Sequence, residues 1–142
     1  MKVQEGKLGR VFILAFDHEE EILEPLKNFI KEKKIKAGFI YLLGAVQSGQ
    51  IVCGPKETVV PPDPIKKELK EANELVAIGS IFWEGAEPKV HLHAALGKGE
   101  KTLLGCIRKA AKVFITIEAL LLEVTDVNFE KKLDPKIGLP IL

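Results

Sequence analysis

The longest apolar run of the chain, VFITIEALLLEV, constrains the fold more than any other feature. It covers Val113–Val124 and is only 12 residues long, whereas a membrane-spanning helix needs roughly 18 apolar residues. It also carries Glu118 in its middle. The run therefore predicts a long β-strand that is buried on both faces, inside a globular protein and outside any membrane.

The size of the chain predicts one domain. A chain of 142 residues can bury a proper core but is too short for two comfortable domains. Hydrophobic residues make up 46% of it, and no low-complexity tract interrupts them. The segment Pro55–Pro64 has four prolines in ten residues, which indicates a loop and not a linker between domains. We therefore expect a single domain that covers residues 1–142.

One helix is predicted near the N-terminus, after a strand at Gly9–Phe16. In residues 17–35, Asp17 is a plausible N-cap and Glu20 its capping-box partner. Pro25 either kinks this helix or shows that its regular part starts later. The apolar residues at helical spacing are Ile22, Leu23, Leu26, Phe29 and Ile30.

Strands dominate the remaining sequence. Residues 37–46 predict a strand, Gln47–Gln50 a turn, and Ile51–Gly54 a second strand. Residues 65–83 are ambiguous, because their first half has a helical composition and their second half resembles a strand. Strands at 89–96 and 102–107 flank a glycine-containing hairpin loop. The fold class is therefore α+β, with a mostly antiparallel or mixed sheet and one or two packed helices.

Charge and cysteine usage narrow the possible functions. The net charge is +1, and only Arg10 and Arg108 are arginines, so no global attraction to nucleic acid is expected. The abundance of lysine and glutamate hints at a thermophilic source. Two cysteines do not make a disulfide framework, and the N-terminus lacks the apolar stretch of a signal peptide. We expect a cytoplasmic protein with no membrane partner.

The segment KVHLHAALGKGEKTLLGCI, at 89–107, contains a candidate metal site. His91 and His93 are two residues apart, so on a strand both imidazoles point to one face, with Cα atoms roughly 6.5 to 7 Å apart. The predicted hairpin brings Cys106 alongside them. Two histidines and one cysteine suit zinc and leave its fourth position open. Glu118 is a candidate fourth ligand, or a partner that fixes a histidine tautomer.

A structural interpretation of the same residues stands beside this one. Exposed strand faces often carry polar residues at alternate positions, and a single cysteine in an apolar strand is usually a small core residue. By the same reasoning, His18 is a solvated residue and Cys53 a structural one. Nucleophilic catalysis has no support, because no G-x-S-x-G motif surrounds either serine. No phosphate-binding glycine loop is present either.

The same segment resembles the H-x-H…G-x-x-x-G-G-H stretch of the plant-and-prokaryote-conserved (PPC) domain family. The resemblance extends over nearly the whole chain, through residues 29–51, 74–85 and 132–142. It implies an α/β domain with an antiparallel sheet, a homotrimer, and, in prokaryotic members, a metal bound by three histidines. His91 and His93 match the first two. Cys106 stands at the third, preceded by the retained Gly105 and by Leu104 in place of a glycine.

The resemblance implies a stand-alone PPC-type homotrimer, a DNA-binding or regulatory module with a zinc site formed by His91, His93 and Cys106. In plants this domain accompanies AT-hook motifs, which this chain lacks. The alternative is a small metal-dependent enzyme, in which zinc activates water or polarises a carbonyl of an unknown substrate. A third possibility is an oligomeric scaffold with a vestigial site. The binding module is favoured over the enzyme.

Overall fold

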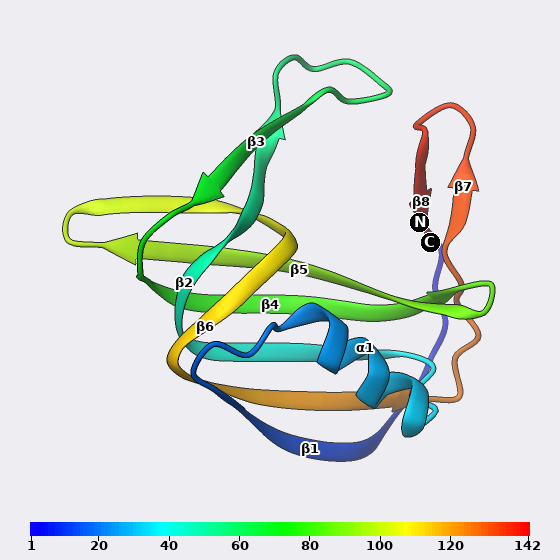
Figure 1. Cartoon of the computed structure of the whole chain (residues 1–142). Coiled ribbons are helices and arrows are strands. Elements are labelled where there is room, and N and C mark those ends of the chain that lie inside the picture. The colour runs from blue at the N-terminus through cyan, green and yellow to red at the C-terminus, as the bar shows by residue number, and fades with distance from the viewer.

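The computed structural model describes all residues, Met1–Leu142, and contains one helix and eight strands (Figure 1). The antiparallel α+β domain predicted from the sequence is confirmed, with a single helix. At ten residues, this helix is too short to cross a bilayer. In chain order, the elements are β1 (Lys7–Asp17), α1 (Leu23–Glu32), β2 (Gly38–Pro55), β3 (Pro64–Leu69), β4 (Asn73–Glu84), β5 (Glu87–Lys98), β6 (Lys101–Thr125), β7 (Lys132–Asp134) and β8 (Leu139–Ile141).

The main sheet has six strands in the order β1-β6-β5-β4-β2-β3, and every neighbouring pair is antiparallel. Strand β6 also pairs with β2, so the pairings β6–β5, β5–β4, β4–β2 and β2–β6 form a closed ring. β6 can do this because it is 25 residues long and curls across the molecule (Figure 1). Its first residues pair with β5, and the rest pair with β2 and β1.

Irregularities in the ladder between β6 and β2 allow β6 to curl. Its register with β2 shifts around Ala110 and Ile115, and both residues have positive φ angles, of 47° and 66°. β6 therefore joins two segments that the sequence suggested as separate strands. Its apolar run is buried on one face only: Ile117 lies in the core, whereas Glu118 and Ile115 are exposed. The prediction that both faces of this strand are buried was wrong, because no second layer of this chain covers its outer side.

The helix begins after Asp17, which is one of the two alternatives that Pro25 left open in the sequence. Its N-cap is Ile22, with no capping side chain, and Pro25 falls in the first turn, where an amide N–H has no helical partner to lose. Asp17 ends β1 instead, and its backbone N–H donates to the Glu20 carboxylate at 2.8 Å. The capping-box pair of the sequence thus stabilises a turn ahead of the helix.

One further expectation was wrong, and one segment that the sequence left ambiguous is a strand, for a similar reason. Residues 47–50 do not turn, since β2 runs through them as part of an 18-residue strand. Gly49 permits this with a φ of 145°, and an added Cβ there would lie 2.9 Å from the Cα of Ala111 on β6. The helix-like composition after Pro64 forms β3, which pairs with β2. In both cases pairing with a distant strand overrides the local preference.

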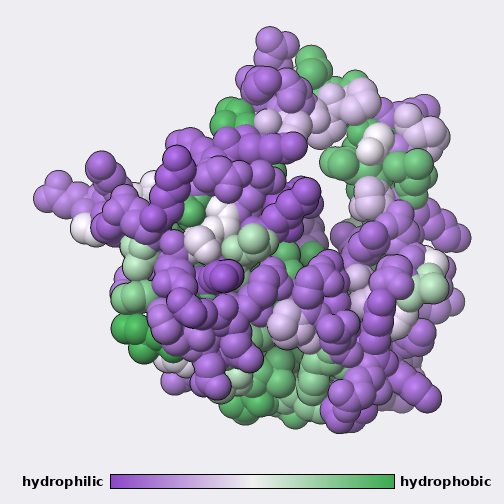
Figure 2. All heavy atoms as spheres, viewed as in Figure 1, coloured by the Kyte–Doolittle hydropathy of each residue, from purple (hydrophilic) through white to green (hydrophobic).

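The core is a cluster of 22 buried residues that lies inside the ring of strands and under α1. Leu23, Leu26 and Ile30 of the helix belong to it. The opposite side of the strands carries exposed apolar side chains, which we call the apolar outer face. Its exposed members are Ile13, Phe39, Tyr41, Leu43, Val76 and Ile78. Figure 2 shows the view of Figure 1, in which hydrophilic residues predominate and hydrophobic ones gather along the lower edge.

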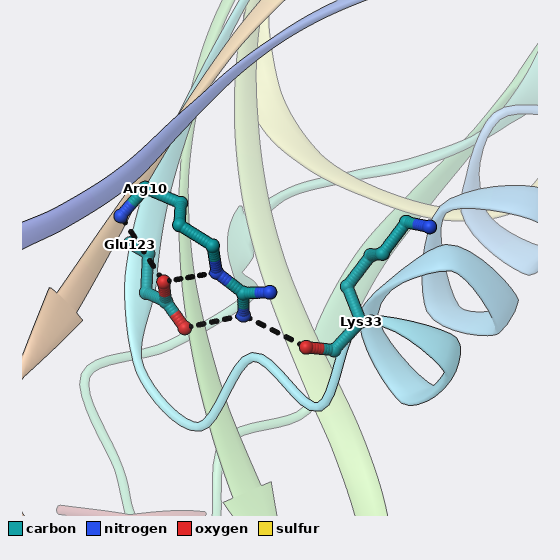
Figure 3. Close-up of polar contacts among 3 residues, drawn as sticks. All are labelled: Arg10, Lys33 and Glu123. Carbon is teal, nitrogen blue, oxygen red and sulfur yellow. Dashed lines mark hydrogen bonds and ion pairs between the residues drawn. The ribbon is translucent and has the colours of Figure 1, made fainter.

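One buried carboxylate, that of Glu123, takes part in a hydrogen-bond network that connects β6, β1 and the end of α1 (Figure 3). Glu123 on β6 is the only buried charged residue, and it accepts hydrogen bonds from the backbone N, Nε and Nη2 of Arg10 on β1, at 3.1, 2.7 and 2.8 Å. The same Nη2 donates to the carbonyl oxygen of Lys33, just after α1, at 2.8 Å. The hydrogen bond from Arg10 holds the pKa of Glu123 below its usual value. This network fixes the end of the helix against both strands.

Candidate metal centre

Strand alternation places His91 and His93 together on the outer side of β5. Leu92, between them, is fully buried in the core, which fixes the orientation of the strand. Across the β5–β6 ladder, His93 lies directly opposite Cys106. The register therefore brings one thiol beside two imidazoles, through the hairpin that the sequence predicted.

The three potential donor atoms converge. One ring nitrogen of each histidine and Sγ of Cys106 all lie within 4.8 Å of one another. The Nε2 atoms of His91 and His93 are 3.0 Å apart, at hydrogen-bonding distance for the appropriate tautomer. Cys106 is buried, with 4% exposure, whereas both histidines are exposed. The group thus has one protected sulfur and two nitrogens that are open to the outer side.

The donor set and its spacing fit a tetrahedral zinc ion. Zinc binds nitrogen at about 2.0 Å and sulfur at about 2.3 Å, so the ligand atoms of a tetrahedral site with one sulfur stand about 3.3 to 3.5 Å apart. The observed separations, from 3.0 Å up to 4.8 Å, bracket this range. Three protein ligands leave the fourth position for water or another ligand. The residues that would hold the ion are His91, His93 and Cys106.

The local electrostatics are dominated by burial and by nearby cations. Although the His91 side chain is exposed, partial desolvation by the surrounding protein lowers its pKa, and the neighbouring His93, Lys131 and Arg108 lower it further. The neutral imidazole, which is the metal-binding form, is thereby favoured. Burial raises the pKa of the Cys106 thiol, although Arg108 and Lys131 act in the opposite direction. The two cations therefore lie close to the metal-binding group.

Glu118 does not join this group. It is exposed, and it lines a shallow depression of the apolar outer face together with Ile13 and Tyr41. In the ladders its neighbour on β2 is Leu43, and the strands β2 and β4 separate it from β5. The sequence suggested a ligand or a tautomer-fixing partner here because a lone carboxylate in an apolar strand was assumed to be buried. Within one chain the Glu118 carboxylate is exposed to solvent, so the fold itself supplies no partner for it.

A cavity of about 510 Å³ opens beside the metal-binding group, with His93 and Cys106 in its wall. Three cations line it, namely Lys66 of β3 and Arg108 and Lys109 of β6. Sequence reasoning missed all three. Arg108 could have been found, because it follows Cys106 by two residues and so shares its face of the strand. Lys66 could not, since only the β2–β3 pairing brings it here.

The other singled-out residues have structural positions. The Nδ1 atom of His18 accepts a hydrogen bond from the backbone N–H of Ile115 at 3.1 Å. Cys53 is half-buried, packs against the core and has a free thiol. Neither lies in the metal-binding group.

Fold and site together define one domain, built on a closed antiparallel sheet, with a candidate metal centre of two histidines and a cysteine on one strand pair. The model of the Plants and Prokaryotes Conserved (PCC) domain matches residues 3–125. The chain belongs to this family, as its H-x-H segment indicated.

Solved structures of similar proteins agree with this assignment. A metal-containing protein from Archaeoglobus fulgidus is 28% identical, with a TM-score of 0.87, over 99% of this chain and 98% of that one. A plant- and prokaryote-conserved protein from Pyrococcus horikoshii is also 28% identical, with a TM-score of 0.86, over 99% and 96%. A candidate DNA-binding protein from Bacteroides thetaiotaomicron, at 22% identity, a TM-score of 0.75 and coverage of 96% and 95%, shares the fold. Among curated proteins, none matches this chain.

Proposed function

We propose that this protein is a zinc-binding regulatory module whose ion is held by His91, His93 and Cys106. The observation that carries the proposal is the convergence of two histidine nitrogens and one cysteine sulfur within 4.8 Å. Two nitrogens and a sulfur suit zinc better than magnesium or calcium, which prefer oxygen ligands. The 28% identical relative from Archaeoglobus fulgidus is described as metal-containing, which supports a bound metal in this chain as well.

We also propose that the protein assembles as a homotrimer through its apolar outer face. Tyr41 and Ile78 are cross-strand neighbours on this face, as are Leu43 and Val76, so the exposed apolar residues are contiguous. Contiguous exposed apolar surface of this kind is typical of an interface between subunits. Ile78 also pairs with His93, so the metal centre borders the proposed interface.

DNA is the proposed macromolecular partner. Two structures that share this fold, from Bacteroides thetaiotaomicron and Ralstonia eutropha, are described as candidate DNA-binding proteins. The net charge of +1 predicts weak binding that is lost as salt increases, since phosphate contacts release counterions. A mobility-shift titration of a DNA duplex at several salt concentrations tests this role. Absence of a complex even at low ionic strength would exclude direct DNA binding.

The proposed location is the cytoplasm, and the proposed source is a thermophile. Both thiols are free, which suits a reducing compartment. Eight ion pairs, most of them formed by lysine and glutamate, suit a protein that works at high temperature. Melting above 90 °C would agree with such a source.

Elemental analysis of the purified protein tests the metal directly. Wild type is expected to hold one zinc per chain, and His91→Ala and Cys106→Ser are expected to lose it. His18→Ala is the matched control, because His18 lies outside the metal-binding group and its loss leaves the site intact. Full zinc occupancy in the Cys106→Ser variant would show that the sulfur is not a ligand. A wild-type protein that binds no added metal would exclude the site altogether.

A metal-dependent hydrolase is the second candidate, and the cavity beside His93 and Cys106 favours it. Zinc with an open position can supply an activated water or polarise a carbonyl. The chain's own part would be to hold a substrate in the cavity against Arg108. Turnover of an activated ester that requires zinc and disappears in His93→Ala would support this function. Equal turnover by wild type and His93→Ala would exclude it.

A further inference from the structure

The cavity beside the metal centre lies between two projecting arms of the fold. The β2–β3 hairpin forms one wall, Leu139 of β8 belongs to the other, and Cys106 and His93 lie between them. The arms meet at their tips, where a Cβ added to Gly138 would lie 3.1 Å from the ring of Pro61. Figure 1 shows both arms at the top of the molecule, and Figure 2 shows a hollow between them.

The charges that line this cavity are all positive. Lys66, Arg108 and Lys109 belong to its wall, and no carboxylate does. None of the three takes part in any of the eight ion pairs of the protein, nor in any side-chain hydrogen bond. On the same arm, by contrast, Lys56 is paired with Asp63 at 2.7 Å. Three cations around one cavity repel one another, so an anion between them would relieve that repulsion.

The remaining wall is apolar or has no side-chain charge. Val52 and Leu139 contribute aliphatic side chains, and three prolines of the β2–β3 arm contribute their rings, namely Pro55, Pro62 and Pro64. The volume of about 510 Å³ falls within the range of about 300 to 1,000 Å³ that is usual for small-molecule sites. The cavity is thus larger than a bare inorganic anion requires. Its shape and lining suit a molecule with both a charged end and an apolar body.

We propose that this cavity binds a small organic anion, whose carboxylate or phosphate group is held by Arg108 and by the open position of the metal. A guanidinium presents paired N–H donors that match either group. Lys66 and Lys109 contribute further positive charge, and the proline-rich arm contacts the apolar body. This inference rests on the proposed function, because the metal is one of the two anchors. The cavity would then be the effector site of the regulatory module.

Calorimetric titration of the zinc-loaded protein tests the site with four probes: phenyl phosphate, benzoate, inorganic phosphate and benzyl alcohol. Phenyl phosphate and benzoate are expected to saturate one site per chain, and the stronger of the two identifies the headgroup. Inorganic phosphate is expected to bind more weakly, since it lacks the apolar body, and neutral benzyl alcohol is not expected to bind. If no anion saturates a site, or if benzyl alcohol binds as well as benzoate, the proposal is overturned.

Two substitutions on β6 test whether Arg108 holds the anion. Arg108→Gln is expected to weaken binding of the anion by about tenfold to 100-fold, as the loss of a charged hydrogen bond would. Lys112→Gln removes an exposed lysine from the same strand outside the cavity, and it is expected to leave the affinity for the anion unchanged. Equal loss in both variants would mean that binding reflects only general positive charge.

The metal anchor has its own measurement. In cobalt-substituted protein, benzoate or phenyl phosphate is expected to alter the visible absorption of the ion at the concentrations that saturate the calorimetric site. Binding without any spectral change would overturn the metal anchor. Elemental analysis of the same samples separates this inference from the proposed function: zinc-loaded protein that binds no anion overturns the inference alone. If no metal binds at all, the proposed function and the metal anchor both fail.

DNA is the competing occupant, since its backbone is also a phosphate. Phenyl phosphate is not expected to displace a short DNA duplex from the protein. Arg108→Gln is expected to lower the affinity for this duplex no more than Lys112→Gln does. If the duplex bound with the same dependence on Arg108 while the small anions did not bind, the cationic cavity would belong to the DNA backbone, and the small-anion assignment would be wrong.

Discussion

At the scale of single residues, the pairing of His93 with Cys106 decides what this protein can bind. The two are cross-strand partners, and His91 shares their side of the sheet. An imidazole or a thiol alone at such a position would be unremarkable for a strand. Their combination gives three donors that can meet on one ion, with the sulfur protected from solvent.

Removal of a donor is therefore expected to abolish tight metal binding. The zinc affinity of Cys106→Ser should fall by more than the roughly 10-fold to 100-fold that is typical when an outer hydrogen-bonding partner of a ligand is lost. Competition with a chromophoric chelator measures this change. Cys53→Ser is the matched control, since Cys53 lies outside the metal-binding group. Equal affinities of wild type and Cys106→Ser would contradict a sulfur ligand.

The buried Glu123 predicts how stability depends on pH. Its carboxylate has a pKa below the ordinary value of 4.5 in the folded protein, chiefly because Arg10 donates hydrogen bonds to it. A carboxylate with a depressed pKa in the folded state stabilises that state above its unfolded pKa, and this contribution is lost as pH falls through the folded value. Between pH 7 and pH 3, wild type should therefore lose more stability than Glu123→Gln does.

Thermal unfolding across this pH range measures the difference. At pH 7, Glu123→Gln should melt below wild type by several degrees, and the gap should narrow as the solution becomes acidic. Asp126→Asn is the control, because its ion pair with Lys7 is exposed and such pairs contribute little. If the difference in melting temperature between wild type and Glu123→Gln were the same at every pH, Glu123 would act through packing and not through its charge.

The site residues could be predicted to different degrees. His91 and His93 were predictable, because the alternation of a strand places them on one side whatever its partners are. Cys106 was predictable through the short hairpin at 97–101. The exposed position of Glu118 was not predictable, because the apolar run around it indicated a strand that is buried on both faces. Lys66 belongs to a distant strand, and no local pattern could have connected it with the site.

At the scale of elements, the crossing of β6 over β2 positions the thiol. Gly105 lies at this crossing, where an added Cβ would stand 2.4 Å from the carbonyl oxygen of Val52. Cys106 follows directly and pairs with Val52 as well as with His93. The close approach of the two backbones therefore determines where the sulfur lies.

A methyl group at this crossing should disturb both stability and metal binding. Gly105→Ala is expected to destabilise the fold by about 1 to 3 kcal/mol, because backbone atoms must move apart. It should also weaken zinc binding by displacing Cys106. Gly97→Ala on β5 is the matched control, since nothing lies within 4 Å of its added Cβ. Chemical denaturation and chelator competition measure the two effects. If Gly105→Ala bound zinc as wild type does, the crossing would not position the ligand.

The elements show where local sequence patterns stop being informative. The central parts of β1 and β5, residues 9–16 and 89–96, were predicted, because their local apolar pattern indicates a strand. The start of α1, the continuity of β2 through residues 47–50 and the strand β3 were not. Each of these depends on pairing or packing with residues far away in the chain. The irregularities of β6 belong to the same class, since only the closed ring requires them.

At the scale of the whole molecule, the apolar outer face is the feature that a monomer does not explain. Leu43 and Ile13 are 60% and 77% exposed, and they lie on the same side of the sheet as Tyr41 and Ile78. Burial of such a surface between subunits would remove it from water, at about 25 cal/mol for each Å². The resemblance to PPC proteins suggested a trimer, and this face is where we propose that it forms.

A charge placed on this face should dissociate the assembly. Ile78→Asp is expected to convert a trimer to monomers, because an unpaired carboxylate would be buried at the interface. Leu133→Asp is the matched control, since Leu133 is similarly exposed on β7 and lies outside the apolar outer face. Sedimentation velocity distinguishes the species. Monomeric wild-type protein at all concentrations would contradict the trimer.

The most direct test of the metal centre is X-ray absorption spectroscopy of the zinc-loaded protein. A site made by His91, His93 and Cys106 predicts one sulfur at about 2.3 Å and two imidazole nitrogens at about 2.0 Å from the ion. The sulfur signal should disappear in Cys106→Ser and persist in Cys53→Ser. A spectrum with only nitrogen and oxygen ligands in the wild-type protein would contradict the proposed centre.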